Sequence, residues 1–153
     1  MKIFLFTLTL LLIYVAIEYL KTSNLIRIGE ALARTAVPFS RDLNLSDERI
    51  LVIGDSTAVG TGASSPETSL AGLLGKRYPN AAIDNLGVNG AKIADVKEQF
   101  KTLKGKRYSL IEIHIGGNDI VRHTDLADVE EDLREVLVMA NTLSDQVILV
   151  SCG

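Results

Sequence analysis

The sequence has a single cysteine, Cys152, and this scarcity excludes several classes of protein. One thiol cannot form an internal disulfide, and it cannot build a structural zinc site that needs two or more thiolates. Cys152 ends an apolar stretch, a position more typical of a small buried residue than of a reactive thiol. Long basic runs are also missing, and the net charge is −3. A nucleic acid is therefore not an expected partner.

Further absences narrow the chemistry. No Gly-Lys-Ser or Gly-Lys-Thr occurs, and Gly60 and Gly62 lack a third glycine at the spacing of a dinucleotide-binding loop. The sequence therefore shows no loop for nucleotide phosphates. Histidine is scarce as well, with only His114 and His123 available as candidate catalytic bases.

What is present amounts to one domain. The chain has 153 residues, of which 47% are hydrophobic and 23% are charged. This length and composition suit one globular domain with a real core, and not two.

The most apolar stretch lies at the N-terminus. Residues 3–17 are apolar except for two threonines and a tyrosine, and the run has about the minimum length for crossing a bilayer. A retained anchor and a cleaved signal peptide both fit this pattern. Tyr19-Leu20-Lys21, which follows, lacks the small side chains of a cleavage site. We therefore expect residues 1–21 to be a transmembrane anchor, with a signal segment as the alternative.

The distribution of charges does not decide on which side of the membrane the domain lies. Lys2 precedes the apolar run, whereas Lys21, Arg27 and Arg34 follow it, and the positive-inside rule then places the domain in the cytoplasm. Export by a short signal-anchor would place it outside. Either way, we expect a single-pass protein of the cytoplasmic membrane.

Residues 22–48 are expected to form an amphipathic helix and a linker. Leu25, Ile28 and Leu32 share one helical face, and Pro38 should end the helix.

From residue 49 to residue 153, strand and helix patterns alternate. Strands are expected at 49–53, 81–86, 108–115 and 146–151, and helices at about 64–78, 91–103 and 125–143. With right-handed crossovers, this order predicts a doubly wound parallel sheet in an α/β fold. The sequence stops directly after the fourth strand, so we expect the domain to be truncated at its C-terminus.

Small and polar residues follow three of the predicted strands, in segments 54–57, 85–90 and 116–119. The carboxyl ends of parallel strands meet at one edge of a sheet, so these segments should lie together. A helix cap or a turn would explain each segment alone. Taken together, they suit a nucleophilic Ser56. The oxyanion that forms on the substrate when Ser56 attacks would be bound by the N–H groups of Ser56 and Gly87 and by the Asn118 amide.

The same segments resemble the sequence blocks of the SGNH hydrolases, also called the GDSL family. Gly54-Asp55-Ser56-Thr57 resembles the first block, with Thr57 in place of the commoner leucine. Asn85-x-Gly87-x-x-Gly90 resembles the second block, and Gly116-x-Asn118-Asp119 resembles the third. The resemblance covers about residues 50–153.

This resemblance implies a flavodoxin-like, three-layer α/β/α fold and a serine esterase or lipase. Ser56 would be the nucleophile, and Ser56, Gly87 and Asn118 would form the oxyanion hole. The substrate would be a small carboxylic ester or thioester, possible examples being lipids and acylated envelope molecules, and no metal or other cofactor would be needed. Asp55 and Asn89 are the candidate substrate-binding residues, although Asp55 is better suited to bonding loop amides. Asp119 would support its own loop.

The last block of the family, Asp-x-x-His, does not occur after the third block. A nucleophilic serine needs a base at neutral pH. His114 is expected to pack inward beside Glu112, and His123 is expected at the surface, so neither is assigned as the base. We expect the full-length protein to be a hydrolase and this stretch alone to be inactive. A non-catalytic binding domain on the same fold is the alternative.

One basic tract surrounds the second helix. Its members are Lys97, Lys101, Lys104, Lys106 and Arg107. A solvated helix face is the expected explanation, and contact with anionic lipid is the alternative.

Overall fold

The computed structural model describes residues 2–43, 46–103 and 105–151, and the chain separates into two units, residues 1–35 and 36–153. Cys152 and Lys104 lie outside the described residues. Each unit is described by itself below.

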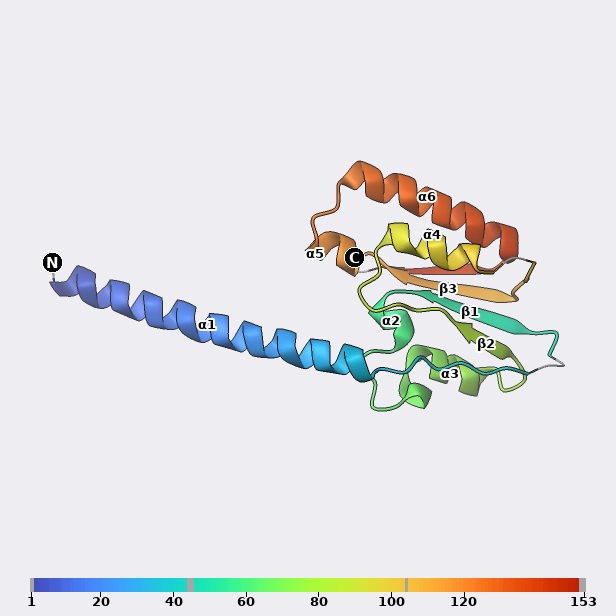
Figure 1. Ribbon diagram of the computed structural model, residues 1–153, viewed down its shortest axis with the longest axis horizontal. Coiled ribbons are helices and arrows are strands. Elements are labelled where there is room, and N and C mark those ends of the chain that lie inside the picture. The colour runs from blue at the N-terminus through green and yellow to red at the C-terminus, as the bar shows by residue number, and fades with distance from the viewer. Residues whose placement is uncertain (1, 44–45, 104, 152–153) are drawn as a thin grey trace. The chain divides into compact units, whose positions relative to one another are not determined.

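The first unit is one continuous helix, α1 (Lys2–Thr35; Figure 1). We expected an anchor followed by a separate amphipathic helix, but α1 runs through both segments without a break. The first proline of the chain is Pro38, so no proline interrupts the helix before its end.

α1 is long and apolar enough to cross a membrane. Residues 4–35 contain a window with a mean hydropathy of 1.8, none of which is buried. A signal sequence has the same properties. The hydroxyls of Thr7 and Thr9 donate to the carbonyls of Phe4 and Leu5, both at 2.9 Å. These polar groups are thus satisfied within the helix, as a lipid environment requires.

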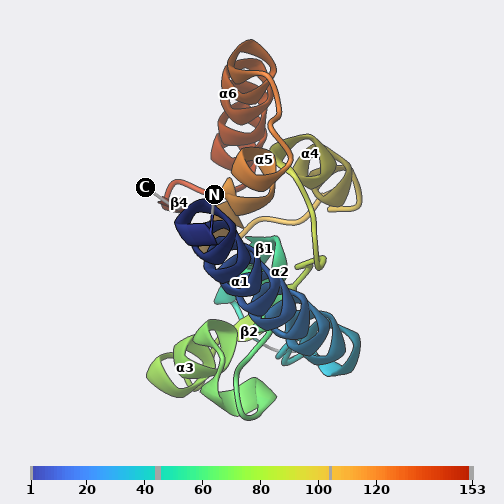
Figure 2. The ribbon, with the colours of Figure 1, turned by 90° about the vertical axis from the view of Figure 1, so that its left-hand side faces the viewer.

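The second unit contains a parallel sheet of four strands, which confirms the predicted α/β class. The strands are β1 (Arg49–Gly54), β2 (Ala82–Asn85), β3 (Leu110–Ile115) and β4 (Val147–Ser151). Their order is β2-β1-β3-β4. Helices α4 (Ile93–Lys101) and α6 (Leu126–Leu143) cover one face of the sheet, and α3 (Leu70–Arg77) covers the other (Figure 2).

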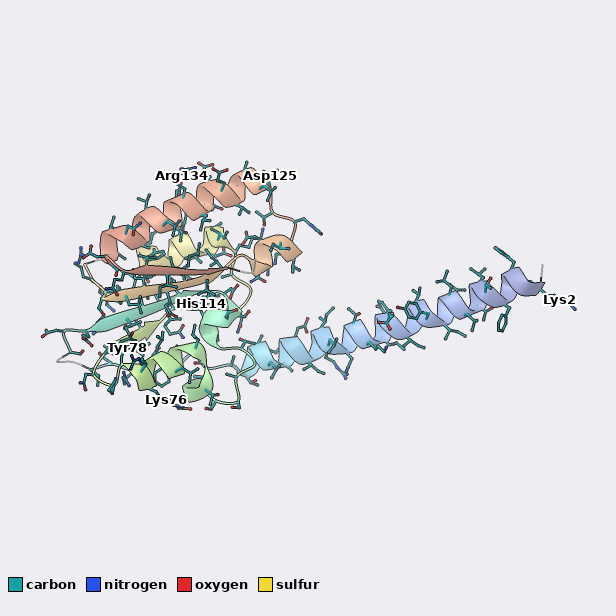
Figure 3. All side chains as sticks on the ribbon, turned by 180° about the vertical axis from the view of Figure 1, so that it is seen from behind. Lys2, Lys76, Tyr78, His114, Asp125 and Arg134 are labelled. Carbon is teal, nitrogen blue, oxygen red and sulfur yellow. The ribbon has the colours of Figure 1, made fainter. Side chains whose placement is uncertain are left out.

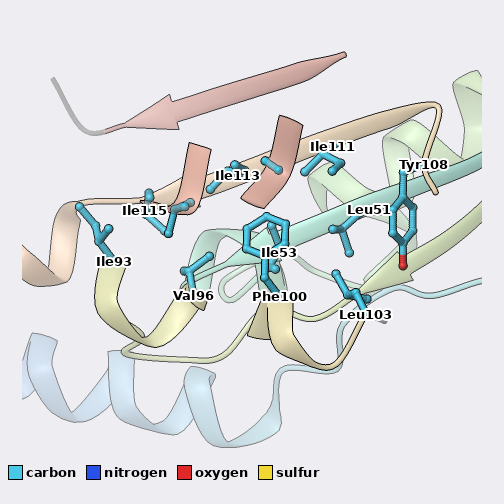
Figure 4. Close-up of a cluster of buried hydrophobic side chains, with 12 residues drawn as sticks. Leu51, Ile53, Ile93, Val96, Phe100, Leu103, Tyr108, Ile111, Ile113 and Ile115 are labelled. Carbon is cyan, nitrogen blue, oxygen red and sulfur yellow. The ribbon is translucent and has the colours of Figure 1, made fainter. Parts of the chain in front are cut away.

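Strand β1 is buried on both faces, as its uninterrupted apolar run predicts. Leu51 and Ile53 pack into the larger core cluster under α4 and α6 (Figure 4). Ile50 and Val52 pack into the second cluster with residues of α3. All four side chains are at most 2% exposed. The central strand therefore holds its carboxyl end rigidly between two packed layers.

The first crossover differs from the expected helix of residues 64–78. A short 3₁₀ turn, Pro66–Thr68, comes first, and α3 begins only at Leu70. Ser69, and not Ser64, caps α3, because its hydroxyl accepts a hydrogen bond from the Gly72 amide at 3.1 Å. Two helices of about one turn were not predicted at all: α2 (Ser56–Val59) and α5 (Gly117–Val121).

The predicted linker also differs from what the structure shows. Residues 36–48 belong to the second unit, where Arg41 forms an antiparallel bridge with Ile83 of β2. The Arg41 guanidinium also donates to the carbonyls of Gly75, Tyr78 and Ala81. An arginine with several backbone acceptors is fixed in place, so the chain around Arg41 is structured although its sequence has no strand period.

A charged cluster binds β1, β2 and the start of β3 together. The Asp84 carboxylate accepts hydrogen bonds from Tyr108 at 2.7 Å, Arg49 at 2.9 Å and Lys106 at 3.1 Å. Desolvation acts to raise the pKa of Asp84, but the hydrogen bonds from Tyr108 and Lys106 and the charge of Arg49 outweigh it, and the net pKa is lowered. Burial and the same carboxylate raise the pKa of Tyr108.

Candidate active site

The first segment of the site is the turn that joins β1 to α2. Gly54 has φ of 135°, and a Cβ atom there would lie 2.0 Å from the His114 carbonyl oxygen. Only glycine can therefore leave β1 in this direction. Asp55 follows as the N-cap of α2, and its Oδ1 accepts a hydrogen bond from the Thr57 amide at 2.8 Å.

Asp55 is 5% exposed, and its carboxylate caps helix α2, whereas we thought it better suited to bonding loop amides. A contact between Asp55 and substrate stays a prediction.

Ser56 is the first residue of α2 and is half-buried. At this position a backbone N–H has no partner within the helix, so it points outward as a donor. The Ser56 carbonyl is held by the amides of Gly60 and Thr61 at 3.1 and 2.9 Å. Within the described part of the chain, the Ser56 hydroxyl makes no hydrogen bond to a neighbouring side chain.

The second segment packs directly against α2. A Cβ atom on Gly87 would lie 2.5 Å from the Val59 nitrogen and 2.8 Å from the Ala58 carbonyl carbon. Gly87 is therefore required for the close approach of this loop to the helix that begins with Ser56.

The Asn85 side chain, which we did not predict to have a role, fixes this approach. Its Nδ2 donates to the Ala58 carbonyl at 2.8 Å, and its Oδ1 accepts from the Gly87 amide at 3.0 Å. The Gly87 N–H, predicted as an oxyanion donor, is thus already engaged. The asparagine itself was visible in the sequence, but its partners are backbone groups that no sequence pattern reveals.

The rest of this loop forms a tight turn. The Ala91 amide donates to the Val88 carbonyl at 3.1 Å, and Gly90 has φ of 80°, as the third residue of a type II turn requires. Among the described residues, the Gly90 N–H has no hydrogen-bond acceptor. Asn89 is exposed, and its Oδ1 accepts from the Thr61 hydroxyl at 2.6 Å. Its predicted contact with substrate is not tested by this geometry.

The third segment lies in α5 and clamps onto the start of α4. The Asn118 Nδ2 donates to the Ala91 carbonyl at 3.0 Å, and the buried Asp119 carboxylate accepts from the Ile93 amide at 3.1 Å. A carboxamide nitrogen carries two hydrogens, so this bond orients Asn118 and leaves the second hydrogen for another acceptor. The Asp119 carboxylate thereby joins its segment to the start of α4, and the support of its own loop that we expected from it stays a prediction.

The three segments therefore meet at one edge of the sheet. Gly87 contacts α2, and Asn118 contacts Ala91, four residues further along the same loop. Helices α2 and α5 lie at the same end of the sheet, where β1 and β3 end (Figure 1).

Neither histidine is positioned as a base for Ser56. His114 is 2% exposed inside the second unit (Figure 3), and its Nε2 lies 3.4 Å from the Glu112 carboxylate. Its Nδ1 is buried without a partner among the described residues. His123 is exposed, with φ of 52°. Both histidines therefore lie where we expected them.

The basic tract is paired internally. Lys97 contacts Asp132 and Glu135, and the hydrogen bonds that its ammonium donates to these carboxylates raise the pKa of Lys97 to about 12. The other described members contact Glu98, Asp84 and Asp145. This pairing fits the expected solvated face and leaves the lipid alternative without support.

An apolar cavity of about 400 Å³ lies between α5, α6 and β4. Its lining includes Ile93, Ile115, Ile120, Leu126, Val129 and Leu133. Among the described residues, no group of three His, Cys, Asp or Glu side chains is placed to hold a metal ion.

Comparison with known families decides which group of proteins shares this arrangement. The model of the GDSL-like lipase/acylhydrolase family matches residues 52–152, which include all three segments of the site. The chain belongs to this family. No curated protein matches the sequence.

Solved structures support the same assignment. Axe2, an acetyl xylan esterase from Geobacillus stearothermophilus solved as a variant, is 26% identical, with a TM-score of 0.52 over 68% of this chain and 59% of Axe2. AlinE4, an SGNH-hydrolase family esterase, is 27% identical, with a TM-score of 0.57 over 71% of this chain and 60% of AlinE4. TesA, at 24% identity, shares the fold, with a TM-score of 0.60 over 67% of this chain and 59% of TesA. The GDSL-family chain thus spans about three fifths of each of these structures.

Proposed function

We propose that the full-length protein is a serine hydrolase that cleaves carboxylic esters or thioesters through an acyl-enzyme on Ser56. The observation that carries this proposal is the outward-facing start of α2. There, a half-buried serine, whose hydroxyl and N–H have no hydrogen-bond partner within the described part of the chain, follows the end of the buried central strand. Membership of the GDSL family supports the reaction class.

The proposed oxyanion hole has three donors. The Ser56 N–H and the second hydrogen of Asn118 Nδ2 are two of them. The third donor was expected at Gly87, whose N–H is bonded to Asn85. We place it instead at Gly90, because its N–H is unpaired among the described residues and the adjacent Ala91 anchors Asn118. Preorganised donors of this kind each contribute about 2.7–4 kcal/mol of transition-state stabilisation.

The reaction then follows the order of acyl transfer. A base takes the proton of the Ser56 hydroxyl as its oxygen attacks the acyl carbon, and the three donors bind the oxyanion that forms. Collapse of this intermediate expels the alcohol or thiol, and water then hydrolyses the acyl-enzyme. Neither His114 nor His123 is placed to act as this base, so we propose that residues 1–153 alone are inactive.

The proposed substrates are small acyl esters, with lipids and acylated envelope molecules as candidates. α1, proposed as a single-pass anchor in the cytoplasmic membrane, would bring the domain close to such molecules. The apolar cavity beside α5 offers space for an acyl chain. Asn89 is proposed to line the substrate pocket.

A fluorophosphonate probe tests the nucleophile in the full-length protein. We expect covalent labelling at Ser56 and its loss in Ser56→Ala. Ser64→Ala, which removes an exposed hydroxyl of a nearby loop, is the matched control and should label normally. Labelling that persists in Ser56→Ala would refute the proposal. A folded wild-type protein that never labels would favour the second candidate, a non-catalytic binding domain on the same fold.

A further inference from the structure

The strongest unassigned feature is a buried carboxamide that bonds the backbone just before Ser56. Gln99 lies on α4 and is 9% exposed. Its Oε1 accepts from the Gly54 N–H at 3.0 Å, and its Nε2 donates to the Gly54 carbonyl at 3.1 Å. One side chain therefore satisfies both backbone groups of a single residue.

The Gly54 N–H needs this partner because the neighbouring strands, as far as the structure describes them, supply no acceptor for it. The register of β1 with β2 ends at Val52, and the Asp55 amide, not that of Gly54, bonds the His114 carbonyl of β3. A buried N–H without an acceptor costs about 1–3 kcal/mol, so the Gln99 Oε1 replaces the one ladder acceptor that the Gly54 N–H lacks.

The Gly54 carbonyl also joins two parts of the site. It accepts a second hydrogen bond, from the Val88 amide at 2.9 Å. Val88 begins the turn that carries Gly90, whereas Gly54 leads directly into Asp55 and Ser56. The orientation of this one peptide group therefore relates the Ser56 N–H to the Gly90 N–H.

We propose that Gln99 is a positioning residue for the nucleophile turn. Its carboxamide fixes the Gly54 peptide groups, and it thereby sets the direction of the Ser56 N–H and hydroxyl relative to the loop of Gly90. This inference rests on the proposed function of Ser56. It assigns a role to a residue outside the three segments that resemble the family blocks.

The sequence contains a faint signal of this role. Val96, Phe100 and Leu103 form the buried stripe of α4, and Gln99 lies three residues after Val96, on the same side. A polar residue on a buried helix face needs a partner, and here the partner is the backbone before Ser56.

Substitution at Gln99 in the full-length protein tests the proposal. Gln99→Met keeps the length of the side chain and removes both hydrogen bonds. We expect kcat for a small aryl ester to fall about ten- to hundredfold, with KM changed less than twofold, because a small displacement of catalytic groups acts on the transition state. Phe100→Leu, on the same helix and in the same core, is the control for lost packing, and its kcat should stay within twofold of wild type.

A second variant adds a pH readout and covers the case in which Gln99→Met does not fold. Gln99→Glu has the same shape, but its ionised carboxylate cannot donate to the Gly54 carbonyl. Burial should raise the pKa of the introduced carboxyl, and its protonated form can donate again. The ratio of its kcat to the wild-type kcat should therefore rise as the pH falls.

The outcomes separate this inference from the proposed function. Folded variants at Gln99 with unchanged kcat would overturn it, and so would a loss that Phe100→Leu reproduces. If the wild-type protein proves unreactive, the proposed function fails, and amide NMR then decides the matter. Larger shifts at Ser56 and Gly90 in Gln99→Met than in Phe100→Leu would support the positioning role, and equal shifts would refute it.

Discussion

Carboxamide side chains make several of the hydrogen bonds that connect the segments of the candidate site. Asn85, Gln99 and Asn118 come from β2, α4 and α5, and each one bonds backbone groups near a strand end. A carboxamide donates and accepts at once and carries no charge, so it can replace sheet hydrogen bonds in a buried place at any pH. These three side chains do not titrate, whereas the two carboxylates of the site, Asp55 and Asp119, bond the amides of Thr57 and Ile93.

Asn118 differs from the other two because it is half-buried, whereas Asn85 and Gln99 are buried, so its second Nδ2 hydrogen is the one proposed to bind the oxyanion. We expect Asn118→Ala to lower kcat by about one to three orders of magnitude with little change in KM, since an oxyanion donor acts mainly in the transition state. Steady-state kinetics of the full-length protein measure both constants. A rise in KM as large as the fall in kcat would instead identify Asn118 as a ground-state binder.

Asp84 offers a prediction about stability and pH. Its pKa is lowered in the folded protein from a model-compound value of 3.8, so the folded state binds the ionised form more favourably than the unfolded state does. This stabilisation is present in full above the unfolded pKa, and it is lost as the pH falls through the lower, folded pKa.

We therefore expect Asp84→Asn to lower the free energy of unfolding by roughly 1–3 kcal/mol at neutral pH, because hydrogen bonds to a charged group are lost. The difference from wild type should shrink as the pH drops below 3.8. Urea denaturation at a series of pH values measures it. A difference that is independent of pH would show that the charge of Asp84 contributes nothing.

Sequence reasoning at this scale found residues whose own chemistry is distinctive. Ser56, Asn118 and Asp119 became candidates because a hydroxyl, an amide and an acid follow strand ends, and their roles in catalysis stay predictions. Asn85 and Gln99 were missed because their partners are backbone atoms of other elements. The same limit explains Gly87, whose glycine requirement comes from packing on α2 rather than from a free N–H.

Among the elements, the one-turn helix α2 determines how Ser56 is presented. Its cap is Asp55, and we expect Asp55→Ala to lower the free energy of unfolding by about 1–2 kcal/mol and to slow probe labelling of Ser56. Asp55→Asn keeps an acceptor for the Thr57 amide and should retain most of both properties. Urea denaturation and labelling kinetics measure the two effects. If KM rises in both variants while stability is unchanged, Asp55 contacts substrate.

The longer elements were predictable and the short ones were not. Helices α4 and α6 have apolar residues with a period of 3.6. The strands are marked by continuous apolar runs or by alternation with a period of two. α2 and α5 span 4 and 5 residues, too few for any period to emerge. Their existence depends on caps and on tertiary contacts such as those of Asn85 and Asp119.

For the whole molecule, the main prediction concerns α1. If residues 1–21 anchor the protein, it should remain with membranes after an alkaline wash. Leu11→Arg combined with Val15→Arg should release it, because each arginine at a helix centre costs about 2.5–3.5 kcal/mol on insertion. Ser23→Arg, beyond the apolar run, is the control and should stay membrane-bound. A mature protein whose mass lacks the N-terminal segment would instead establish a cleaved signal peptide.

The alternation of strand and helix patterns predicted the parallel sheet and the α/β fold class. It did not predict that the folded unit begins before residue 49. Residues 36–48 have no regular sequence period, and Arg41 joins its segment to the second unit by donating hydrogen bonds to the carbonyls of Gly75, Tyr78 and Ala81. Single-residue anchors of this kind are invisible to any method that depends on periodicity.

The two edge strands of the sheet, β2 and β4, differ in how far they are covered. Beside β2, the segment of Arg41 occupies the border, whereas in the described part of the chain β4 pairs only with β3. Ile148, Leu149 and Val150 of β4 are 47%, 37% and 42% exposed. A free strand with apolar side chains recruits strands from other molecules. A preparation of residues 1–153 should therefore self-associate at high concentration through β4, even in detergent that shields α1.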